Sequence, residues 1–213
     1  MNNMKLVTII VTRSKSCHVK TLHTILRMNL KCIQSKFMNE IVFVDDDPYK
    51  KAEAVQRYIK LCDRIFFVDF GVGVDQDSIN QVFEKHEGIG CLVFPGVKEG
   101  VDWDLFKAKV CNDAQEPVEQ MGLHFDTEVS NKISDNIYSV KSTEARVWFI
   151  NTKIAIKNVK DKKTGNVVIH PKILEKFKEK GMKIYAFTAA KLTMTYTHEC
   201  ISNILNAAGV KSS

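Results

Sequence analysis

The sequence has no long apolar run. None of its 213 residues belongs to a stretch approaching the roughly twenty consecutive apolar residues of a membrane-spanning helix. The opening residues, Met1-Asn-Asn-Met-Lys5, lack the apolar core of a secretion signal. We therefore expect a chain without a membrane span and with a cytoplasmic location.

Paired cysteines are absent as well. The six cysteines stand singly, without C-x-x-C or metal-type spacing, at positions 17, 32, 62, 91, 111 and 200. Cys62 and Cys91 adjoin apolar runs, which is typical of small buried side chains. A domain of this length needs no disulfides, so the sequence favours a reducing compartment.

Several motifs of nucleotide-binding proteins and hydrolases are missing. No G-x-G-x-x-G follows the first predicted strand, and the Walker and G-x-S-x-G motifs are absent, which argues against an NTPase of that class and a serine hydrolase. The net charge of +6 is diffuse, without a basic block interleaved with aromatics. A small phosphorylated ligand explains the positive net charge as well as a nucleic acid would. We therefore expect no nucleic-acid partner.

The sequence does contain a regular alternation of strands and helices. Hydrophobic residues make up 45% of the chain, enough for a core. Short β-branched runs predict strands at 6–12, 41–44, 64–68 and 91–94, and helical spacing predicts helices at 18–33, 48–59, 77–86 and 103–110. This order predicts an α/β fold with a central, mostly parallel mixed sheet flanked by helices, Rossmann-type in its first half.

The regular alternation of predicted strands and helices ends after Glu116-Pro117. Further strands are predicted at 138–140, 145–150, 167–169 and 183–187, with a hairpin-like connection near 134–136, a helix at 171–180 and a closing helix from Thr195 or Thr197 through Ile204. No linker separates the halves, so we expect one domain over residues 1–213, with the part after residue 115 added to the part before it.

Polar residues stand at the predicted carboxyl ends of the four strands, where open parallel sheets bind ligands. These ends carry Thr12-Arg13, Asp45-Asp46-Asp47, Asp69 and Pro95-Gly-Val-Lys98. Three adjacent carboxylates repel each other by roughly 1 kcal/mol per close pair in water. Mg²⁺ or Mn²⁺ would offset that repulsion and bridge to a diphosphate. Alternatively, Asp47 caps the helix that Pro48 opens; we expect a cap for one aspartate and a ligand role for at least one other.

Three other positions have two readings each. Asp75-Gln-Asp77 has metal-diphosphate spacing, but its place before a helix favours a cap. His198 follows a threonine-rich run at a predicted helix start, which suits a phosphate or metal site, although a lone histidine is more often structural. Trp103, between Asp102 and Asp104, either stacks on a sugar or belongs to the core.

Longer motifs resemble a known family. The order of strand, helix and Val-Asp-Asp-Asp47 resembles the nucleotide-sugar-binding half of GT-A glycosyltransferases. More closely, four segments look like the glycosyltransferases encoded by large algal (chlorella) viruses: Phe94-Pro-Gly-Val-Lys-Glu-Gly-Val-Asp-Trp103, Trp148-Phe-Ile-Asn-Thr152, Tyr185-Ala-Phe-Thr-Ala-Ala-Lys191 and Tyr196-Thr-His-Glu199. The resemblance spans nearly the whole chain.

This resemblance implies transfer of a sugar from a UDP-sugar, such as a UDP-glucose-like hexose, with Mn²⁺ or Mg²⁺, to a viral glycan or glycoprotein in the host cytoplasm. Residues 1–115 would bind the nucleotide-sugar, and residues 116–213 would bind the acceptor and close the site. Carried over, the metal ligands would be Asp45, Asp47 and His198, and Thr12, Arg13, Asp45 and Asp46 would contact the donor. From their residue types and positions, we expect Lys98, Trp103 and Lys191 to contact the donor as well.

The chain departs from the GT-A pattern in one place. GT-A enzymes usually carry Asp-x-Asp after the fourth strand, whereas this chain has Pro95-Gly-Val-Lys98 there.

An inverting reaction needs a base near the acceptor hydroxyl, for which Asp102 or Asp104 is the candidate. The alternatives are a nucleotidyltransferase on a similar sheet and a non-catalytic sugar-binding module of a larger protein.

Overall fold

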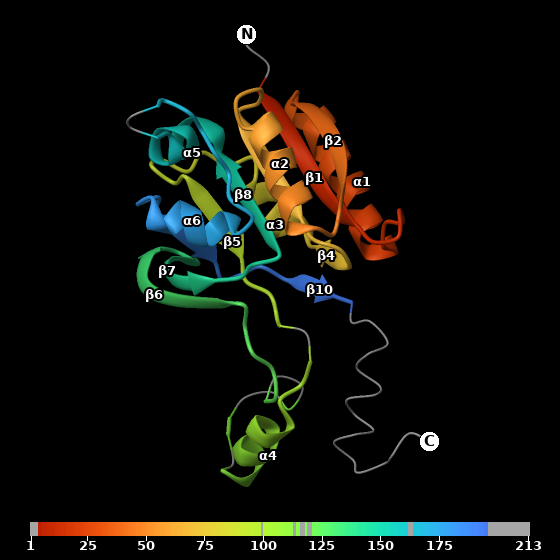
Figure 1. The fold of residues 1–213 in the computed structure, drawn as a ribbon. Helices are drawn as coiled ribbons and strands as arrows, with labels where there is room; N and C mark the ends of the chain where they lie inside the picture. The colour runs from red at the N-terminus through yellow and green to blue at the C-terminus, as the bar shows by residue number, and fades with distance from the viewer. Residues whose placement is uncertain are drawn as a thin grey trace.

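The computed structural model describes residues 4–98, 100–112, 114–115, 118, 121–161 and 164–195. Its centre is an eight-stranded mixed sheet with the order β2-β1-β3-β8-β5-β9-β7-β6 (Figure 1). The strands are β1 (Lys5–Thr12), β2 (Met38–Asp45), β3 (Arg64–Val68), β5 (Cys91–Phe94), β6 (Thr127–Ser134), β7 (Ile137–Thr143), β8 (Val147–Asn151) and β9 (Ile184–Phe187). The predicted fold class is confirmed.

The direction of the strands changes at β8. Strand β1 pairs in parallel with β2 and β3, and β5 pairs in parallel with β9. Strand β8, from the second half of the chain, lies antiparallel between β3 and β5. The hairpin of β6 and β7 completes the sheet beyond β9, with antiparallel pairing.

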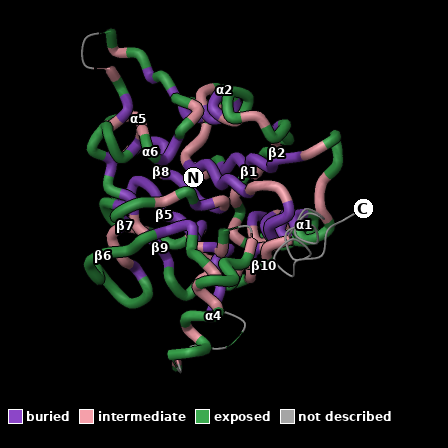
Figure 2. Tube along the Cα trace, turned by 60° about the horizontal axis from the view of Figure 1, so that its bottom comes forward, coloured by how far each residue is buried: buried purple, intermediate pink, exposed green. Residues whose placement is uncertain are grey.

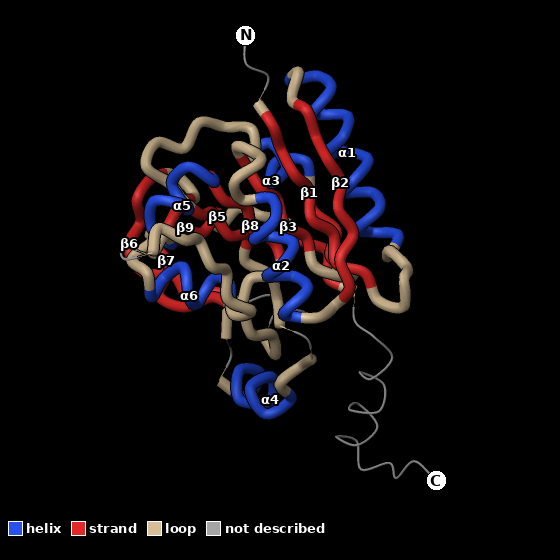
Figure 3. The backbone as a smooth tube through the Cα atoms, turned by 45° about the horizontal axis from the view of Figure 1, so that its top comes forward, coloured by secondary structure: helices blue, strands red, loops and turns tan. Residues whose placement is uncertain are grey.

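Helices cover both faces of this sheet (Figure 3). Helices α1 (Val19–Ser35) and α3 (Gln76–Gln81) contribute to one core, whereas α2 (Pro48–Tyr58), α5 (Thr152–Val159) and α6 (Ile173–Glu179) contribute to the other. Strands covered on both faces need apolar residues at nearly every position. This requirement explains the run Ile9-Ile10-Val11 of β1, in which Ile9 faces one core and Ile10 the other.

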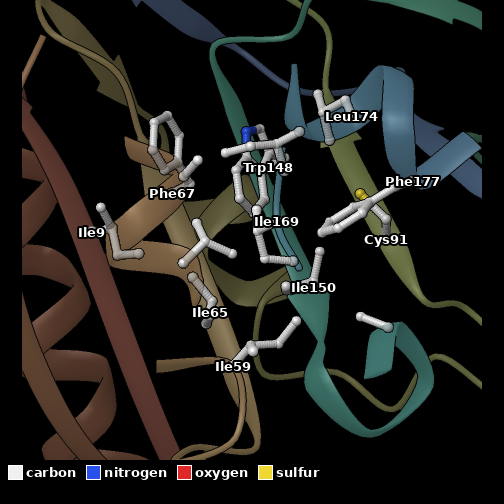
Figure 4. Close-up of a cluster of buried hydrophobic side chains, with 14 of the residues drawn as sticks. Ile9, Ile59, Ile65, Phe67, Cys91, Trp148, Ile150, Ile169, Leu174 and Phe177 are labelled. Carbon is white, nitrogen blue, oxygen red and sulfur yellow. The ribbon is translucent and has the colours of Figure 1, made fainter. Parts of the chain in front are cut away.

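The larger core contains a stacked aromatic pair. The rings of Phe67 on β3 and Trp148 on β8 lie 4.7 Å apart and are inclined by only 4°. Leu174 and Phe177 of α6 and Ile169 pack into the same core (Figure 4). The antiparallel pairing of Phe67 with Trp148 therefore fixes the two halves of the chain to each other in the middle of the sheet.

Two features lie outside the main sheet. Strands β4 (Val72–Val74) and β10 (Leu192–Met194) form a small antiparallel pair, which brings residues 192–194 back to the loop after β3. Helix α4 (Trp103–Cys111) has no buried residue and projects beyond the sheet (Figure 1). The exposed α4 and β6 contrast with the buried β1 (Figure 2).

Some sequence predictions need correction. Residues 167–169 form no strand; only Val167 makes an isolated bridge, with Lys160. Strand β4 at residues 72–74 and helix α5 were not predicted. The helix at 18–33 is confirmed, but only Ile25 of its apolar stripe is buried; the stripe's other members, Val19, Leu22, Leu26, Leu30 and Ile33, are exposed. Within the described parts of the chain, no helix has the length and apolarity to cross a membrane.

Candidate functional site

The carboxyl ends of β1, β2 and β3 meet at one edge of the sheet. The parallel register places Thr12 beside Asp45, and the Asp46 amide donates to the Thr12 carbonyl at 3.0 Å. Strand β8 begins at the same edge because it runs in the opposite direction. The amide of Asp69 donates to the carbonyl of Arg146, just before β8, at 2.9 Å.

Five charged side chains form a network at this edge, which we call the edge network. Lys51 of α2 lies 2.5 Å from Asp46 and 3.4 Å from Asp69. Arg13 pairs with Asp46 at 2.6 Å, and Arg146 pairs with Asp69 at 3.6 Å. Two carboxylates thus share three cations. All except Arg13 are at most one-quarter exposed, so solvent screening of their attraction is incomplete.

The loop after β3 completes the edge network. Phe70 lies beneath Arg13, whose guanidinium carbon is 5.1 Å from the ring centroid, and His18 meets the same ring edge-on. Arg146 also donates to the Phe70 carbonyl. Burial alone would raise the pKa of Asp46, but hydrogen bonds from Lys51 and Arg13 outweigh it and hold that pKa below its usual range. Asp46 is therefore ionised at neutral pH.

The predicted acidic triplet divides into three separate roles. Asp45 pairs with Lys50 at 2.5 Å on the surface, and that hydrogen bond lowers the Asp45 pKa. Asp47 caps α2 by accepting from the amides of Tyr49 and Lys50 at 3.0 and 2.9 Å, which agrees with the predicted helix cap. Asp46 alone joins the edge network. Lysine and arginine side chains therefore already offset the repulsion that suggested a metal.

The predicted metal ligands are not gathered together in the described part of the chain. There, no group of three histidine, cysteine, aspartate or glutamate side chains is arranged to hold an ion. His198 lies outside the described residues. The assignment of Asp45, Asp47 and His198 to a metal therefore stays a prediction.

The predicted donor residues occupy different places. Thr12 is buried, and its hydroxyl donates to the Val44 carbonyl at 3.2 Å. Lys98, after β5, pairs with Glu144 at 2.8 Å. Lys191 lies at the start of α3, where its amide donates to Asp75 at 3.2 Å. Only Arg13 and Asp46 of the predicted donor residues join the edge network. Asp75 caps α3, as the sequence favoured over a metal-diphosphate site.

The predicted bases and the tryptophan lie on or beside α4. Asp102 caps this helix through the Leu105 amide at 2.8 Å and accepts from His124 at 3.0 Å, which lowers its pKa. Asp104 follows in the first turn, and Trp103 contacts Phe106 edge-on. Since α4 projects beyond the sheet (Figure 1), these residues are not gathered with the edge network.

Sequence reasoning did not select four residues that the structure brings forward: Lys51, Asp69, Arg146 and Asp126. Asp69 directly follows a predicted strand, but nothing in the sequence links it to Arg146, which lies 77 positions later. Lys51 is one lysine of a pair with Lys50, and only the fold shows which one faces the sheet. The sequence signal available for these four residues was a position just after a predicted strand, and of the four only Asp69 has it.

Asp126 is the most unusual carboxyl among the described residues. It is 5% exposed, and one oxygen accepts from the Gly96 amide at 3.1 Å and the Thr127 hydroxyl at 2.8 Å. Its other oxygen is buried and has no hydrogen-bond partner in the described structure. Burial raises the pKa of Asp126. A carboxyl held in this way, just before β6 and against Gly96, is a candidate for proton transfer.

Comparisons with known proteins give distant structural similarity only. No family model matches the chain, and no curated protein matches it. A crystal structure of GalNAc-T7 with UDP, GalNAc and Mn²⁺ aligns with 92% of this chain and 44% of that one, at a TM-score of 0.46 and 13% identity. An active-site mutant of LgtC aligns with 84% of this chain and 72% of that one, at a TM-score of 0.30 and 14% identity. The chain thus spans less than half the length of the GalNAc-T7 chain.

Proposed function

We propose that the protein is a glycosyltransferase that moves a hexose from a UDP-sugar to a glycan or glycoprotein. The observation that carries this proposal is the edge network, in which two carboxyl side chains and three basic side chains meet where open α/β sheets bind ligands. The motifs that resemble viral glycosyltransferases support the same reading. The donor would lie across the carboxyl ends of β1, β2 and β3.

The cations of the edge network suit a diphosphate. Guanidinium groups bind phosphate oxygens through two parallel hydrogen bonds, and the edge network contains two of them: Arg13 beside Asp46 and Arg146 beside Asp69. Charge builds up on the diphosphate as its bond to the sugar breaks, and fixed cations stabilise that charge. In this proposal Arg13 and Arg146 hold the leaving group.

A divalent ion, if the donor brings one, would be held by Asp46 and Asp69. These carboxylates share a single cation, the Lys51 ammonium, in the described structure. Mg²⁺ commonly uses one or two carboxylates together with substrate phosphates, so this pair fits the chemistry better than Asp45 and Asp47 do. When bound, the ion would supply charge neutralisation at the leaving diphosphate.

The acceptor hydroxyl must lose a proton during transfer. Asp126 suits that task because burial raises its pKa toward the range in which a carboxylate is an effective base. Asp102, hydrogen-bonded to His124, is the other candidate, as predicted from the sequence. Replacing each by asparagine and comparing turnover assigns the role.

Calorimetry with UDP, GDP and CMP, in Mn²⁺ and in chelator, tests the function. We expect UDP to bind clearly with Mn²⁺ and weakly without it, and Asp46→Asn to lose binding. Equal binding in Mn²⁺ and in chelator would rule out the metal but keep the donor site. Preference for nucleoside triphosphates would indicate a nucleotidyltransferase, and absence of nucleotide binding would leave a sugar-binding module.

A further inference from the structure

Three cavities follow one another along one side of the molecule. The largest, about 830 Å³, lies between the β6–β7 hairpin and α6. A cavity of about 300 Å³ shares Thr143, Glu144, Leu174 and Glu175 with it and reaches Lys51 and Asp69 of the edge network. A third, of about 460 Å³, shares Lys98 and Phe125 with the largest and reaches Asp102 and His124. Because neighbours share walls, we treat them as one feature, the lateral groove.

Backbone pairing holds the middle of the lateral groove together. The Lys98 amide donates to the His124 carbonyl at 2.7 Å, and the Asp126 amide donates to the Gly96 carbonyl at 2.9 Å. Val97 and Phe125 form an antiparallel bridge between them. Lys98, Phe125 and Asp126 are therefore placed by a short ladder that joins β5 to the hairpin.

The charges in the lateral groove are balanced by neighbours. Glu144 pairs with Lys98 at 2.8 Å, and Glu128 pairs with Lys141 at 2.6 Å. Glu175 and Glu179 pair with lysines of their own segment, at 3.0 and 2.5 Å. Asp126 lies near the positive charges of Lys98 and Arg146. A ligand of strong charge of either sign would have to break these pairs.

Hydroxyl groups and an aromatic ring complete the lining. The Thr127 hydroxyl lies 2.8 Å from the Thr143 hydroxyl, and Ser142 donates to Glu128 at 3.2 Å. Phe125, at the junction of two cavities, is 58% exposed. Hydroxyl groups together with one exposed aromatic ring match a sugar, which presents hydroxyls at its rim and an apolar ring face.

We propose that the lateral groove binds the acceptor as an extended, neutral oligosaccharide. This inference rests on the proposed function and deepens it. The acceptor's reacting end lies toward Lys51 and Asp69, and Phe125 stacks on a sugar unit farther along the chain. The largest cavity alone has a volume within the range of about 300–1,000 Å³ typical of ligand pockets, so the three together suit several linked units.

The experiment compares Phe125→Ala with the matched control Phe43→Ala. Both side chains are 58% exposed, but Phe43 lies on the edge strand β2, outside the lateral groove. Labelled wild type and both variants are applied, with UDP and Mn²⁺, to an array of neutral, uronic-acid and sulfated oligosaccharides and lysine-rich peptides. Hits are then measured by titration with fragments of one to five units.

We expect wild type to bind neutral oligosaccharides, with affinity rising at least tenfold from one unit to four. Phe125→Ala should remove that rise, while Phe43→Ala keeps it. In turnover assays Phe125→Ala should raise KM for long acceptors at least tenfold and leave kcat within twofold. Donor affinity should be equal in all three proteins.

Other outcomes overturn the inference. Preference for sulfated or uronic-acid chains, preference for lysine-rich peptides, absence of any bound oligosaccharide, or equal affinity for one unit and four each contradict an extended neutral acceptor in this groove. UDP titration of the same samples distinguishes the two proposals. If wild type does not bind UDP, the proposed function is wrong. If wild type binds UDP but gives any of these array results, only the acceptor inference is wrong.

Discussion

Lys51, in the first turn of α2, forms an ion pair of 3.4 Å with Asp69 at the end of β3. The same ammonium lies 2.5 Å from Asp46 after β2. One lysine therefore joins the two carboxylates that best fit a divalent ion. Lysine and ion would compete for the same oxygens, and that competition is measurable.

Lys51→Ala is expected to raise the affinity for Mn²⁺ at least tenfold, equivalent to about 1.4 kcal/mol. Removing the ammonium leaves Asp46 and Asp69 with no lysine between them, so an added cation relieves their repulsion. Calorimetric titration with Mn²⁺ alone measures the effect. Lys50→Ala is the control, since Lys50 pairs with the exposed Asp45 instead. Unchanged or weaker Mn²⁺ binding in Lys51→Ala contradicts a metal site at this carboxylate pair.

Asp46→Asn is expected to reduce UDP affinity at least tenfold. Asp45→Asn combined with Asp47→Asn should change it less than threefold, because these side chains pair with Lys50 and cap α2. Asparagine is also a good N-cap, so the double variant should lose well under ~1 kcal/mol of stability. If the double variant loses UDP while Asp46→Asn keeps it, the site lies at Asp45 and Asp47, as the sequence suggested.

The pH dependence of stability should also identify Asp46. Its pKa is lowered on folding, so the stability it contributes is present above its unfolded pKa of about 3.9 and is lost as pH falls through the lower folded value. Chemical unfolding between pH 2 and 7 should therefore show wild type more stable than Asp46→Asn at pH 5 to 7, with the gap closing in acid. A gap that is constant with pH would show that the Asp46 charge contributes nothing.

Asp126→Asn is expected to gain stability and lose activity. Burial raises the pKa of Asp126 in the folded state, so the folded protein favours the protonated carboxyl. The stability that Asp126 contributes is therefore fully present below its unfolded pKa, and it is lost as pH rises through its folded pKa. Asparagine avoids that loss, and each kcal/mol regained raises Tm by about 2–4 °C. Tm at pH 5 and 8, with turnover at pH 8, checks this. A lower Tm at pH 8, or unchanged turnover, contradicts the assignment.

Leu26→Gln in α1 should change the free energy of unfolding by no more than about 0.5 kcal/mol, as surface substitutions usually do. Met28→Ala should cost about 2–5 kcal/mol, because Met28 is fully buried. Urea unfolding of both variants gives the comparison. A large loss in Leu26→Gln would mean that the outward stripe is covered in solution.

The same helix shows how far the sequence could lead. Apolar spacing located α1 correctly, but the buried face consists of Thr21, Thr24, Ile25, Met28 and Cys32. Two of these are threonines, so the spacing of apolar residues did not identify the face that packs on the sheet. The strands 64–68 and 91–94 matched to the residue, since β-branched and aromatic runs buried on both faces are unambiguous.

The site was predicted only at its strand ends. Arg13 and Asp46 follow strands that the sequence located, so their place at the sheet edge followed from parallel topology. Arg146 reaches this edge because β8 runs antiparallel between β3 and β5, and no local signal encodes that insertion. The lateral groove depends on the same long-range arrangement. The division into a donor half and an acceptor half stays a prediction.

The central position of β8 also has a kinetic consequence. Strands β3 and β5 do not pair with each other; both pair with β8, whose residues come more than fifty positions after β5. The first half of the chain therefore cannot close its sheet when it leaves the ribosome, and its two inner strand edges remain open until residue 151 has been made. Open strand edges invite pairing with other chains. Folding of this protein should accordingly be a late, concerted event with slow non-local closure, and its nascent first half should depend on chaperones.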